Sequence, residues 1–165
     1  MLDAKGYRLN VGIVIADGKG NVLWAKRKRQ GGWQFPQGGI REGESPIDAM
    51  YRELYEEVGL LPQDVELWGQ TRSWWRYRLP EKMVREIPGK QTCIGQKQRW
   101  FLLYLKSPES AIRLDAHDDP EFESWRWVSY WFPVLQIIEF KCWVYRNMLR
   151  ELSRKHSEKV LSLSK

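Results

Sequence analysis

Three glutamates within GESPIDAMYRELYEEVGL, residues 43–60, are spaced so that they could bind a metal ion together. Each residue of an α-helix advances by about 100°, so Glu53, Glu56 and Glu57 would project within a sector roughly 100° wide. Like charges at this spacing repel each other and destabilise a helix. A bound Mg²⁺ or Mn²⁺ would remove the repulsion, since both ions bind a few carboxylates together with water and phosphate oxygens. The spacing therefore indicates a divalent-metal site suited to phosphate chemistry.

The same glutamates also allow a purely structural interpretation. Arg41 and Arg52 lie nearby in the sequence and could form ion pairs with them on a solvent-exposed helix face. Neither Glu53 nor Glu57, however, has a Lys or Arg four residues later, the spacing that would offset its charge. We therefore favour the metal site and keep the exposed, ion-paired helix face as its alternative.

Signals at both ends of this segment predict a helix over Pro46–Val58. Ser45 is a suitable N-cap residue, and Gly59 follows the last turn, where a glycine commonly ends a helix. Four apolar side chains at helical spacing form a stripe beside the acidic face: Ile47, Met50, Leu54 and Val58. The helix could therefore pack against a core and present its acids at the edge of that core.

Apolar runs and turn formers locate the elements that must position this helix. We expect strands over residues 10–16, 22–27, 33–36, 65–72, 93–105 and 124–131, with an irregular basic stretch reaching residue 90. A second helix is predicted from about Pro133 to Lys155, with one apolar face formed by Ile137, Val144, Met148 and Leu152. This order of elements indicates an α/β fold, a mixed sheet between helices, in a single domain spanning residues 1–165.

Composition limits the classes of partner. The chain carries 27 Lys and Arg against 21 Asp and Glu, and its pI near 9.4 favours polyanionic partners. Ten tryptophans indicate an aromatic-rich core, with flat stacking surfaces as the alternative. Cys93 and Cys142 lie far apart with no CxxC companion, so we expect no disulfide partner. No apolar leader or membrane-length run is visible, which predicts a cytoplasmic protein with no membrane partner.

The segment GGIREGESPIDAMYRELYEEVGL, residues 38–60, resembles the Nudix box. That signature is written as G, five residues, E, seven residues, R-E, an apolar residue, any residue, E-E, any residue, G, an apolar residue. Every specified position is filled without a gap, by Gly38, Glu44, Arg52, Glu53, Leu54, Glu56, Glu57, Gly59 and Leu60. The resemblance implies the Nudix fold, an α/β/α sandwich with a catalytic loop-helix-loop that binds divalent cations and hydrolyses nucleoside diphosphates linked to another moiety.

Further segments resemble the bacterial RNA 5′-pyrophosphohydrolase branch of that family, which overlaps with dinucleoside polyphosphate hydrolases. They are GYRLNVGIVI, WQFPQGGI, IGQKQRWFLL and PEFESWRWVSYW. The branch implies an enzyme that converts 5′-triphosphorylated or 5′-diphosphorylated RNA to 5′-monophosphorylated RNA, which would prime mRNA decay. Hydrolysis of diadenosine tetra- or pentaphosphate is the alternative, and a non-catalytic nucleotide or RNA sensor is a remote one because the glutamates are intact. The sequence does not identify a protein activator.

The resemblance also implies roles in the metal site. Glu53, Glu56 and Glu57 would be metal ligands, with more than one Mg²⁺ or Mn²⁺ when substrate is bound, and a backbone carbonyl near Gly38 could be another ligand. One of the three carboxylates, with Glu53 preferred, would accept a proton from the attacking water. Glu121 would assist the metals, although an isolated acidic residue in a loop is ordinarily just solvated.

Other box residues are expected to support these ligands. Arg52 would orient a ligand glutamate and is counted with the catalytic residues, whereas Glu44 and Gly59 would hold the box itself.

Candidate substrate-binding residues lie outside the box. In GQKQRW the period of a strand sends Gln96 and Gln98 to one face, where they could bind the phosphate chain or the attacking water, or simply form the wet face of an edge strand. Arg8, Arg27 and Phe140 match positions that the branch uses for RNA, with Phe140 as a base-stacking residue or as plain core. Residues 74–78, WWRYR, interleave rings and cations in a way that suits single-stranded RNA.

Overall fold

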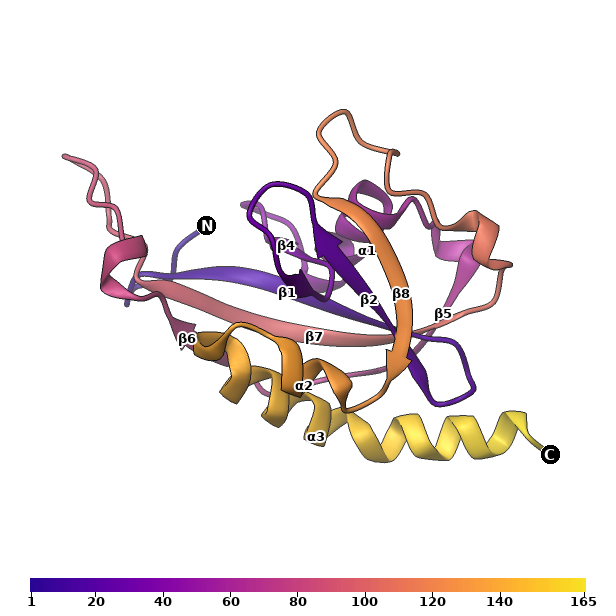
Figure 1. Cartoon of the computed structure of the whole chain (residues 1–165). Helices are drawn as coiled ribbons and strands as arrows, with labels where there is room; N and C mark the ends of the chain where they lie inside the picture. The colour runs from indigo at the N-terminus through magenta and orange to yellow at the C-terminus, as the bar shows by residue number, and fades with distance from the viewer.

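A computed structural model describes all residues, 1–165, and shows one mixed sheet of eight strands between helices (Figure 1). The strands are β1 Tyr7–Ala16, β2 Asn21–Arg27, β3 Trp33–Gln34, β4 Gln37–Gly39, β5 Val65–Gln70, β6 Trp75–Arg78, β7 Gly95–Leu105 and β8 Phe122–Ser129. The helices are α1 Pro46–Val58, α2 Phe132–Gln136 and α3 Glu139–Leu163, with 3₁₀ turns at Pro62–Asp64, Glu81–Met83 and Glu109–Ala111. The expected α/β fold with a mixed sheet is confirmed.

Strands β1 and β7 form the centre of the sheet, in the order β3-β2-β1-β7-β5. They run parallel in unbroken register from Tyr7 opposite Gly95 to Ala16 opposite Tyr104. Their apolar halves are buried on both faces, as expected for a strand covered on two sides. Gly12 is required here because any side chain at that position would enter the ring of Trp100.

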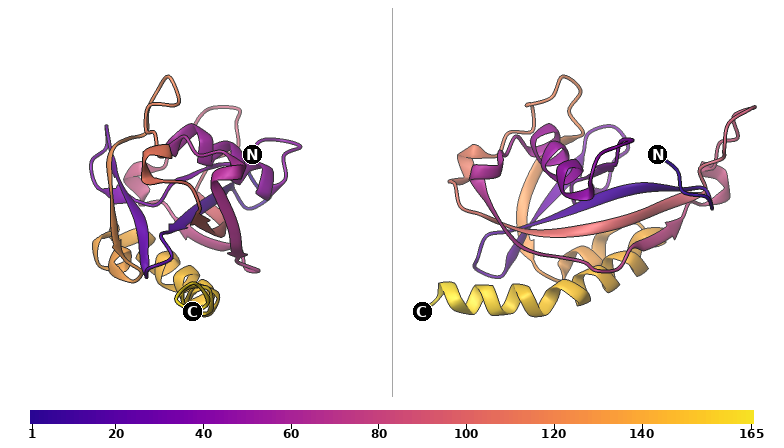
Figure 2. Two further views of the ribbon diagram at one scale, coloured as in Figure 1. Left: turned by 90° about the vertical axis from the view of Figure 1, so that its right-hand side faces the viewer. Right: turned by 180° about the vertical axis from the view of Figure 1, so that it is seen from behind.

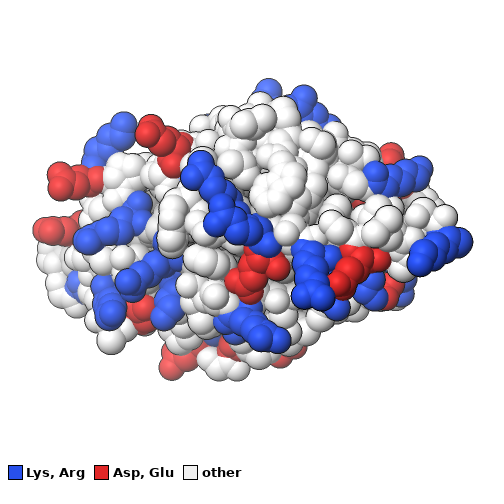
Figure 3. Space-filling view, turned by 90° about the horizontal axis from the view of Figure 1, so that it is seen from below, with Lys and Arg blue, Asp and Glu red and all other residues white.

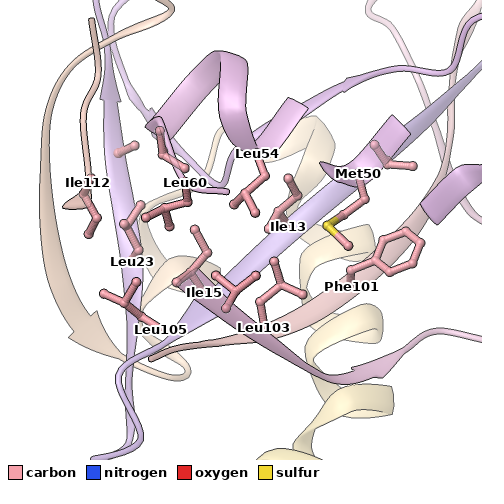
Figure 4. Close-up of a cluster of buried hydrophobic side chains, with 14 of the residues drawn as sticks. Ile13, Ile15, Leu23, Met50, Leu54, Leu60, Phe101, Leu103, Leu105 and Ile112 are labelled. Atoms are coloured by element: carbon pink, nitrogen blue, oxygen red, sulfur yellow. The ribbon is translucent and has the colours of Figure 1, made fainter. Parts of the chain in front are cut away.

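Helices cover the two faces of the sheet separately, α1 on one and α2 with α3 on the other (Figure 2). The core under α1 contains Met50 and Leu54, packed against Ile13, Ile15 and other strand residues (Figure 4). The core under α3 is rich in aromatic rings, with the mutually packed set Trp24, Phe35, Trp100 and Tyr145. Each face of the sheet thus has its own hydrophobic core, which fixes both helices relative to the central strands.

The tryptophans divide between the two interpretations of the sequence. Trp24, Trp68 and Trp100 are buried in the core under α3, whereas Trp131 and Trp143 are exposed at 47% and 56%. The expected aromatic core is therefore present, and some tryptophans remain free for surface contacts. No helix combines the length and the apolar character that crossing a membrane would require.

The prediction for α1 is confirmed at both ends. The Ser45 hydroxyl accepts a hydrogen bond from the Asp48 N–H at 3.2 Å, and Gly59 has a left-handed φ of 73°. The predicted apolar stripe is wrong at Ile47, which is 37% exposed because it lies in the first turn, outside the core. Ala49 is fully buried there instead.

The C-terminal part differs from the single helix predicted from about Pro133 to Lys155. It forms two helices, because Ile137 and Ile138 adopt extended conformations between α2 and α3. The break buries Ile137 in the core, leaves Ile138 54% exposed, and α3 then continues to Leu163. The apolar face of Val144, Met148 and Leu152 is buried as predicted.

The stretch predicted as irregular up to residue 90 contains strand β6, which pairs with β7. Rings and cations alternate along this strand, so they lie on opposite faces of it. Trp75 and Tyr77 contact α3, whereas Arg76 and Arg78 are exposed. Trp and Tyr favour strands, but a run of four residues is too short for its local sequence to predict the strand, which forms by pairing with β7.

We expect Gly59→Ala to destabilise the protein more than Gly43→Ala does. Both glycines have positive φ, which costs other residues about 1 to 2 kcal/mol. A Cβ at Gly59 would also lie 2.8 Å from the Cβ and carbonyl oxygen of Arg113, whereas a Cβ at Gly43 would meet nothing within 4 Å. Urea denaturation should show Gly59→Ala losing at least about 1 kcal/mol more of the free energy of unfolding. Equal losses would contradict this account of the helix end.

Candidate active site

A cavity of about 450 Å³ opens where the N-terminal halves of β1 and β7 meet β4 and the start of α3. Glu53 and Glu57 of α1 line it together with Gly38 of β4. Arg8, Arg27 and Lys141 bring cations to its walls, and Tyr77 and Phe140 bring rings. Residues from every part of the chain therefore meet at one site, which we call the central cavity.

Glu53 and Glu57 are buried carboxylates, each 9% exposed. Glu57 Oε2 accepts one hydrogen bond, from the Gln37 N–H at 3.2 Å, and forms no ion pair. Burial raises the pKa of Glu57 well above its usual range, and the nearby charges of Glu53 and Glu121 raise it further. Burial also raises the pKa of Glu53, against the opposing hydrogen bond from Arg52. Of these two carboxylates, only Glu53 has an arginine partner, and the charge of Glu57 is not offset by an ion pair.

Arg52 connects the box loop to the helix. Its Nε and Nη2 each donate to the Glu44 carboxylate at 2.8 Å, and Nη2 also donates to the Gly39 carbonyl at 2.8 Å. Its Nη1 donates to Glu53 Oε1 at 2.7 Å, which orients that carboxylate. The hydrogen bonds from Arg52 lower the pKa of Glu44 to about 2, so Glu44 stays ionised. Arg52 therefore lies between Glu44 of the loop and Glu53 of the helix, in contact with both.

Glu56 shares the acidic face of α1 but does not line the central cavity. Its carboxylate lies 3.4 Å from Arg52 Nη1 and 3.6 Å from Arg41 Nη2. No three His, Cys, Asp or Glu side chains are gathered into a ready-made metal cluster. The ion-paired face considered from the sequence thus describes Glu56, whereas Glu57 has no cationic partner.

The residues around Glu53 and Glu57 fit a hard divalent cation. Carboxylate oxygens are the donors that Mg²⁺ and Mn²⁺ prefer, and two buried ones face the same cavity. Gly38 leaves the space that they need, because a Cβ there would lie 1.9 Å from the Glu53 carboxyl carbon. A cation between the carboxylates would also offset the charge repulsion that raises the pKa of Glu57.

Glu121 reaches the central cavity from the loop before β8. Its side chain is 44% exposed and pairs with Arg27, whose Nε lies 3.3 Å from Oε1. Its backbone carbonyl accepts from the Lys28 N–H at 2.9 Å, which ties the loop to the end of β2. Glu121 therefore lies on the wall of the cavity, near enough for its charge to act on Glu57.

The two strand glutamines have different positions. Gln96 lines the cavity, and its Oε1 accepts from Gln37 Nε2 at 3.2 Å. Gln98 is fully buried and donates to Asn10 Oδ1 at 2.8 Å and to Gln37 Oε1 at 3.3 Å. The alternative of an edge strand is wrong, because β7 pairs with β1 on one side and with β5 and β6 on the other. Gln98 is connected to the cavity only through the side chains of Asn10 and Gln37, so it is not positioned to contact a substrate directly.

The three residues expected to bind RNA all line the central cavity. Arg8 lies on β1, with its guanidinium over Gly39, and Arg27 ends β2. Phe140, in the first turn of α3, is half-buried and packs on Tyr77 with ring centroids 5.6 Å apart. Phe140 is thus neither plain core nor a free ring, since one part packs on β6 and another faces the cavity.

Lys141 is a cavity residue that the sequence did not reveal. It is 7% exposed, and its Nζ donates to Gln34 Oε1 at 3.1 Å. Burial and the charge of Arg27 lower the pKa of Lys141 to about 8. A single Lys at the start of a helix carries no sequence signal, because only the fold of α3 against β6 brings it here.

The family follows from comparison with known sequences. A sequence model described as NUDIX domain matches residues 6–152. The RNA pyrophosphohydrolase of Shewanella piezotolerans is 58% identical over 153 residues, covering 93% of this chain and 88% of that protein. The RNA pyrophosphohydrolase of Psychromonas ingrahamii is also 58% identical over 153 residues, with 93% and 84% covered. The chain belongs to the Nudix family, whose hydrolases generally depend on divalent cations.

Solved structures agree on the fold. The E. coli dihydroneopterin triphosphate pyrophosphohydrolase superposes with a TM-score of 0.65 at 21% identity, covering 87% of this chain and 94% of that one. A C. elegans Ap4A hydrolase in a binary complex gives 0.61 at 19% identity, covering 89% and 96%. The expected Nudix fold is confirmed, with its box helix at α1.

We expect Glu57→Gln to be at least as stable as the unsubstituted protein when a chelator removes divalent cations. The raised pKa means that ionised Glu57 destabilises the folded state, so this cost grows as pH rises above the ordinary carboxyl pKa of about 4 and vanishes below it. Melting curves should therefore favour Glu57→Gln near neutral pH and converge in acid. Added Mg²⁺ should raise the melting temperature of the unsubstituted protein only.

Glu66→Gln is the matched control, because Glu66 is an exposed carboxylate on β5. It should respond to Mg²⁺ as the unsubstituted protein does. A Glu57→Gln protein that melts well below the unsubstituted one without metal would instead show that Glu57 stabilises the fold through contacts of its own.

Proposed function

We propose that this protein is an RNA 5′-pyrophosphohydrolase, which removes phosphates from 5′-triphosphorylated or 5′-diphosphorylated RNA and leaves a 5′-monophosphate. The observation that carries this proposal is the composition of the central cavity. It brings two buried carboxylates together with cations and aromatic rings around one cavity. Relatives that are 58% identical over most of the chain carry the name RNA pyrophosphohydrolase, which supports the same substrate class.

The reaction assigned to this cavity is attack by water on a phosphorus atom, in line with the phosphoanhydride oxygen that leaves. The P–O bond to water forms as the anhydride bond breaks, and pyrophosphate is released from a triphosphorylated end. Glu53, Glu57 and Glu121, which line the cavity, would hold Mg²⁺ or Mn²⁺, and Glu56 on the same face of α1 would join them by exchanging its arginine contacts for the metal. The metal would spread the charge that develops on the phosphate oxygens. One of the two buried carboxylates, Glu53 or Glu57, accepts the proton that the water loses.

Other residues position these groups. Arg52 keeps the Glu53 carboxylate turned toward the cavity through the bond from its Nη1. Gln98 acts on the site through Asn10 and Gln37, both of which line the cavity. A backbone carbonyl near Gly38 would be a further metal ligand. The geometry needed for attack thus depends on a hydrogen-bonded support behind the ligands.

The remaining walls suit the first nucleotides of an RNA. Arg8, Arg27 and Lys141 offer cations to the phosphate chain. Phe140, held against Tyr77, presents a ring on which a base can stack. Because stacking does not depend on base identity, this wall accepts RNA ends of varied sequence.

We expect Glu57→Gln and Glu56→Gln to keep the fold and lose at least about a hundredfold in kcat/KM, since each removes charge that acts on the transition state. The substrate should be decided in a competition between 5′-triphosphorylated RNA and diadenosine tetraphosphate at equal concentration. RNA should be consumed first, in a reaction that a chelator stops and Mg²⁺ or Mn²⁺ restores. Preferential cleavage of diadenosine tetraphosphate would replace the RNA proposal, and turnover that ignores chelation would remove the metal assignment.

We also expect Arg27→Ala and Phe140→Ala to weaken cleavage of a triphosphorylated trinucleotide but barely change that of a nucleoside triphosphate. Loss of one base-stacking partner costs about 1 to 3 kcal/mol. Measuring kcat/KM for both substrates tests this, with folding checked by circular dichroism. Equal losses on both substrates would leave a Nudix hydrolase without RNA selectivity.

A further inference from the structure

A second aromatic pair lies beside the central cavity. Strand β6 and helix α3 meet through two ring contacts, first Tyr77 with Phe140 and then Trp75 with Trp143, both with centroids 5.6 Å apart. The first pair lines the cavity, and the second does not. Residues two apart on a strand are separated by about 6.6 Å, and residues three apart on a helix by about 4.5 Å along its axis. The second pair is therefore the next contact between β6 and α3 beyond the pair that lines the cavity.

Trp143 is presented rather than packed away. It is 56% exposed, so it lies on the face of α3 that points away from the core. Its partner Trp75 is held in place, because the Glu151 carboxylate accepts from Trp75 Nε1 at 3.0 Å and from the Arg72 N–H at 2.6 Å. A fixed ring thus supports the edge of an exposed one, and this arrangement leaves much of Trp143 open to a stacking partner.

Cations continue along the same face of α3. Arg146 and Arg150 follow Trp143 by three and seven residues, which places both near it in angle around the helix. Both are exposed, and neither forms an ion pair with a carboxylate within 4.0 Å. Further along α3, a surface groove is lined by both signs of charge, with Arg72, Arg154 and Lys155 beside Glu151 and Glu158. Figure 3 looks onto the side of the molecule that carries α3, and basic side chains are spread widely over it.

We propose that Trp75, Trp143, Arg146 and Arg150 form a track for the single-stranded RNA that extends beyond the nucleotides held in the central cavity. A base stacks on Trp143, and the two arginines meet the phosphates that follow. This inference rests on the proposed function, because it assigns a path to the rest of the same substrate. Charge complementarity and the position next to the cavity favour RNA over a protein partner, since an exposed ring and two unpaired cations lie together on one face, where a base could stack and phosphates could bind.

The test compares RNA of two lengths on the intact enzyme. Binding is measured with 5′-monophosphorylated single strands of three and of about ten nucleotides, so that no turnover is needed. Trp143→Ala should weaken binding of the longer strand at least about fivefold and leave the trinucleotide unchanged. Arg146→Gln with Arg150→Gln should make the salt dependence of log K for the longer strand shallower by about 1.4, or about 0.7 for each lost phosphate contact.

Matched variants guard against indirect effects. Trp131→Ala removes another exposed tryptophan, at 47% exposure. The double variant Lys106→Gln with Arg113→Gln removes two exposed cations that follow the C-terminal end of β7. Both should bind the two strands as the unsubstituted protein does. The arginine variant alters no buried packing, so it tests the track even if Trp143→Ala disturbs the fold.

Two outcomes would overturn the track. Unchanged binding of the longer strand by both track variants would show that RNA does not run there and would leave the face for a protein partner. Equal weakening of both strand lengths would make Trp143 part of the cavity or of the fold. A separate measurement of turnover on a triphosphorylated trinucleotide tests the proposed function, so the two ideas can fail independently.

Discussion

The Arg52 guanidinium makes the interaction on which the rest of the site depends. It binds Glu44 through two nitrogens, the Gly39 carbonyl, and Glu53. Because it is a planar group with fixed donor directions, it sets the position of the loop, of β4 and of the first carboxylate at once. The ionised Glu44 keeps this arrangement in place over the ordinary range of pH, so the loop stays docked on α1 whatever happens inside the cavity.

That docking allows the protein to tolerate a costly arrangement of charge. Glu53 and Glu57 are buried side by side at the edge of the core, and only Glu53 has an arginine partner. The hydrophobic core under α1 holds this helix against the sheet, and the spacing of four residues along the helix keeps the two carboxylates next to each other. The free energy that the cores contribute to folding thus maintains a pair of carboxylates whose remaining negative charge a divalent cation would balance.

The opposite wall is assembled from parts that belong to the other core. Helix α3 starts after the break at Ile137 and Ile138, and its first turn brings Phe140 and Lys141 to the cavity. The same helix carries Trp143 and the arginines outward along β6. One helix therefore connects the cavity, where the 5′ end of a substrate would react, to the surface proposed for the remaining nucleotides. In this proposal the acidic site binds metal, and the basic surface of the chain binds the phosphates of the RNA.

The sequence by itself determined α1, its two caps and the spacing of its three glutamates, because these depend on residues close together in the chain. It also identified the family, because the box is recognised by residue types at fixed spacing. Only the tertiary structure decided that Gln98 is a buried support, that Lys141 lies in the cavity, and that Trp75 to Arg78 form a strand. It also decided that Glu56 pairs with arginines and that Glu57 does not. These outcomes depend on contacts between residues far apart in the chain, such as Tyr77 with Phe140, which no local pattern can specify.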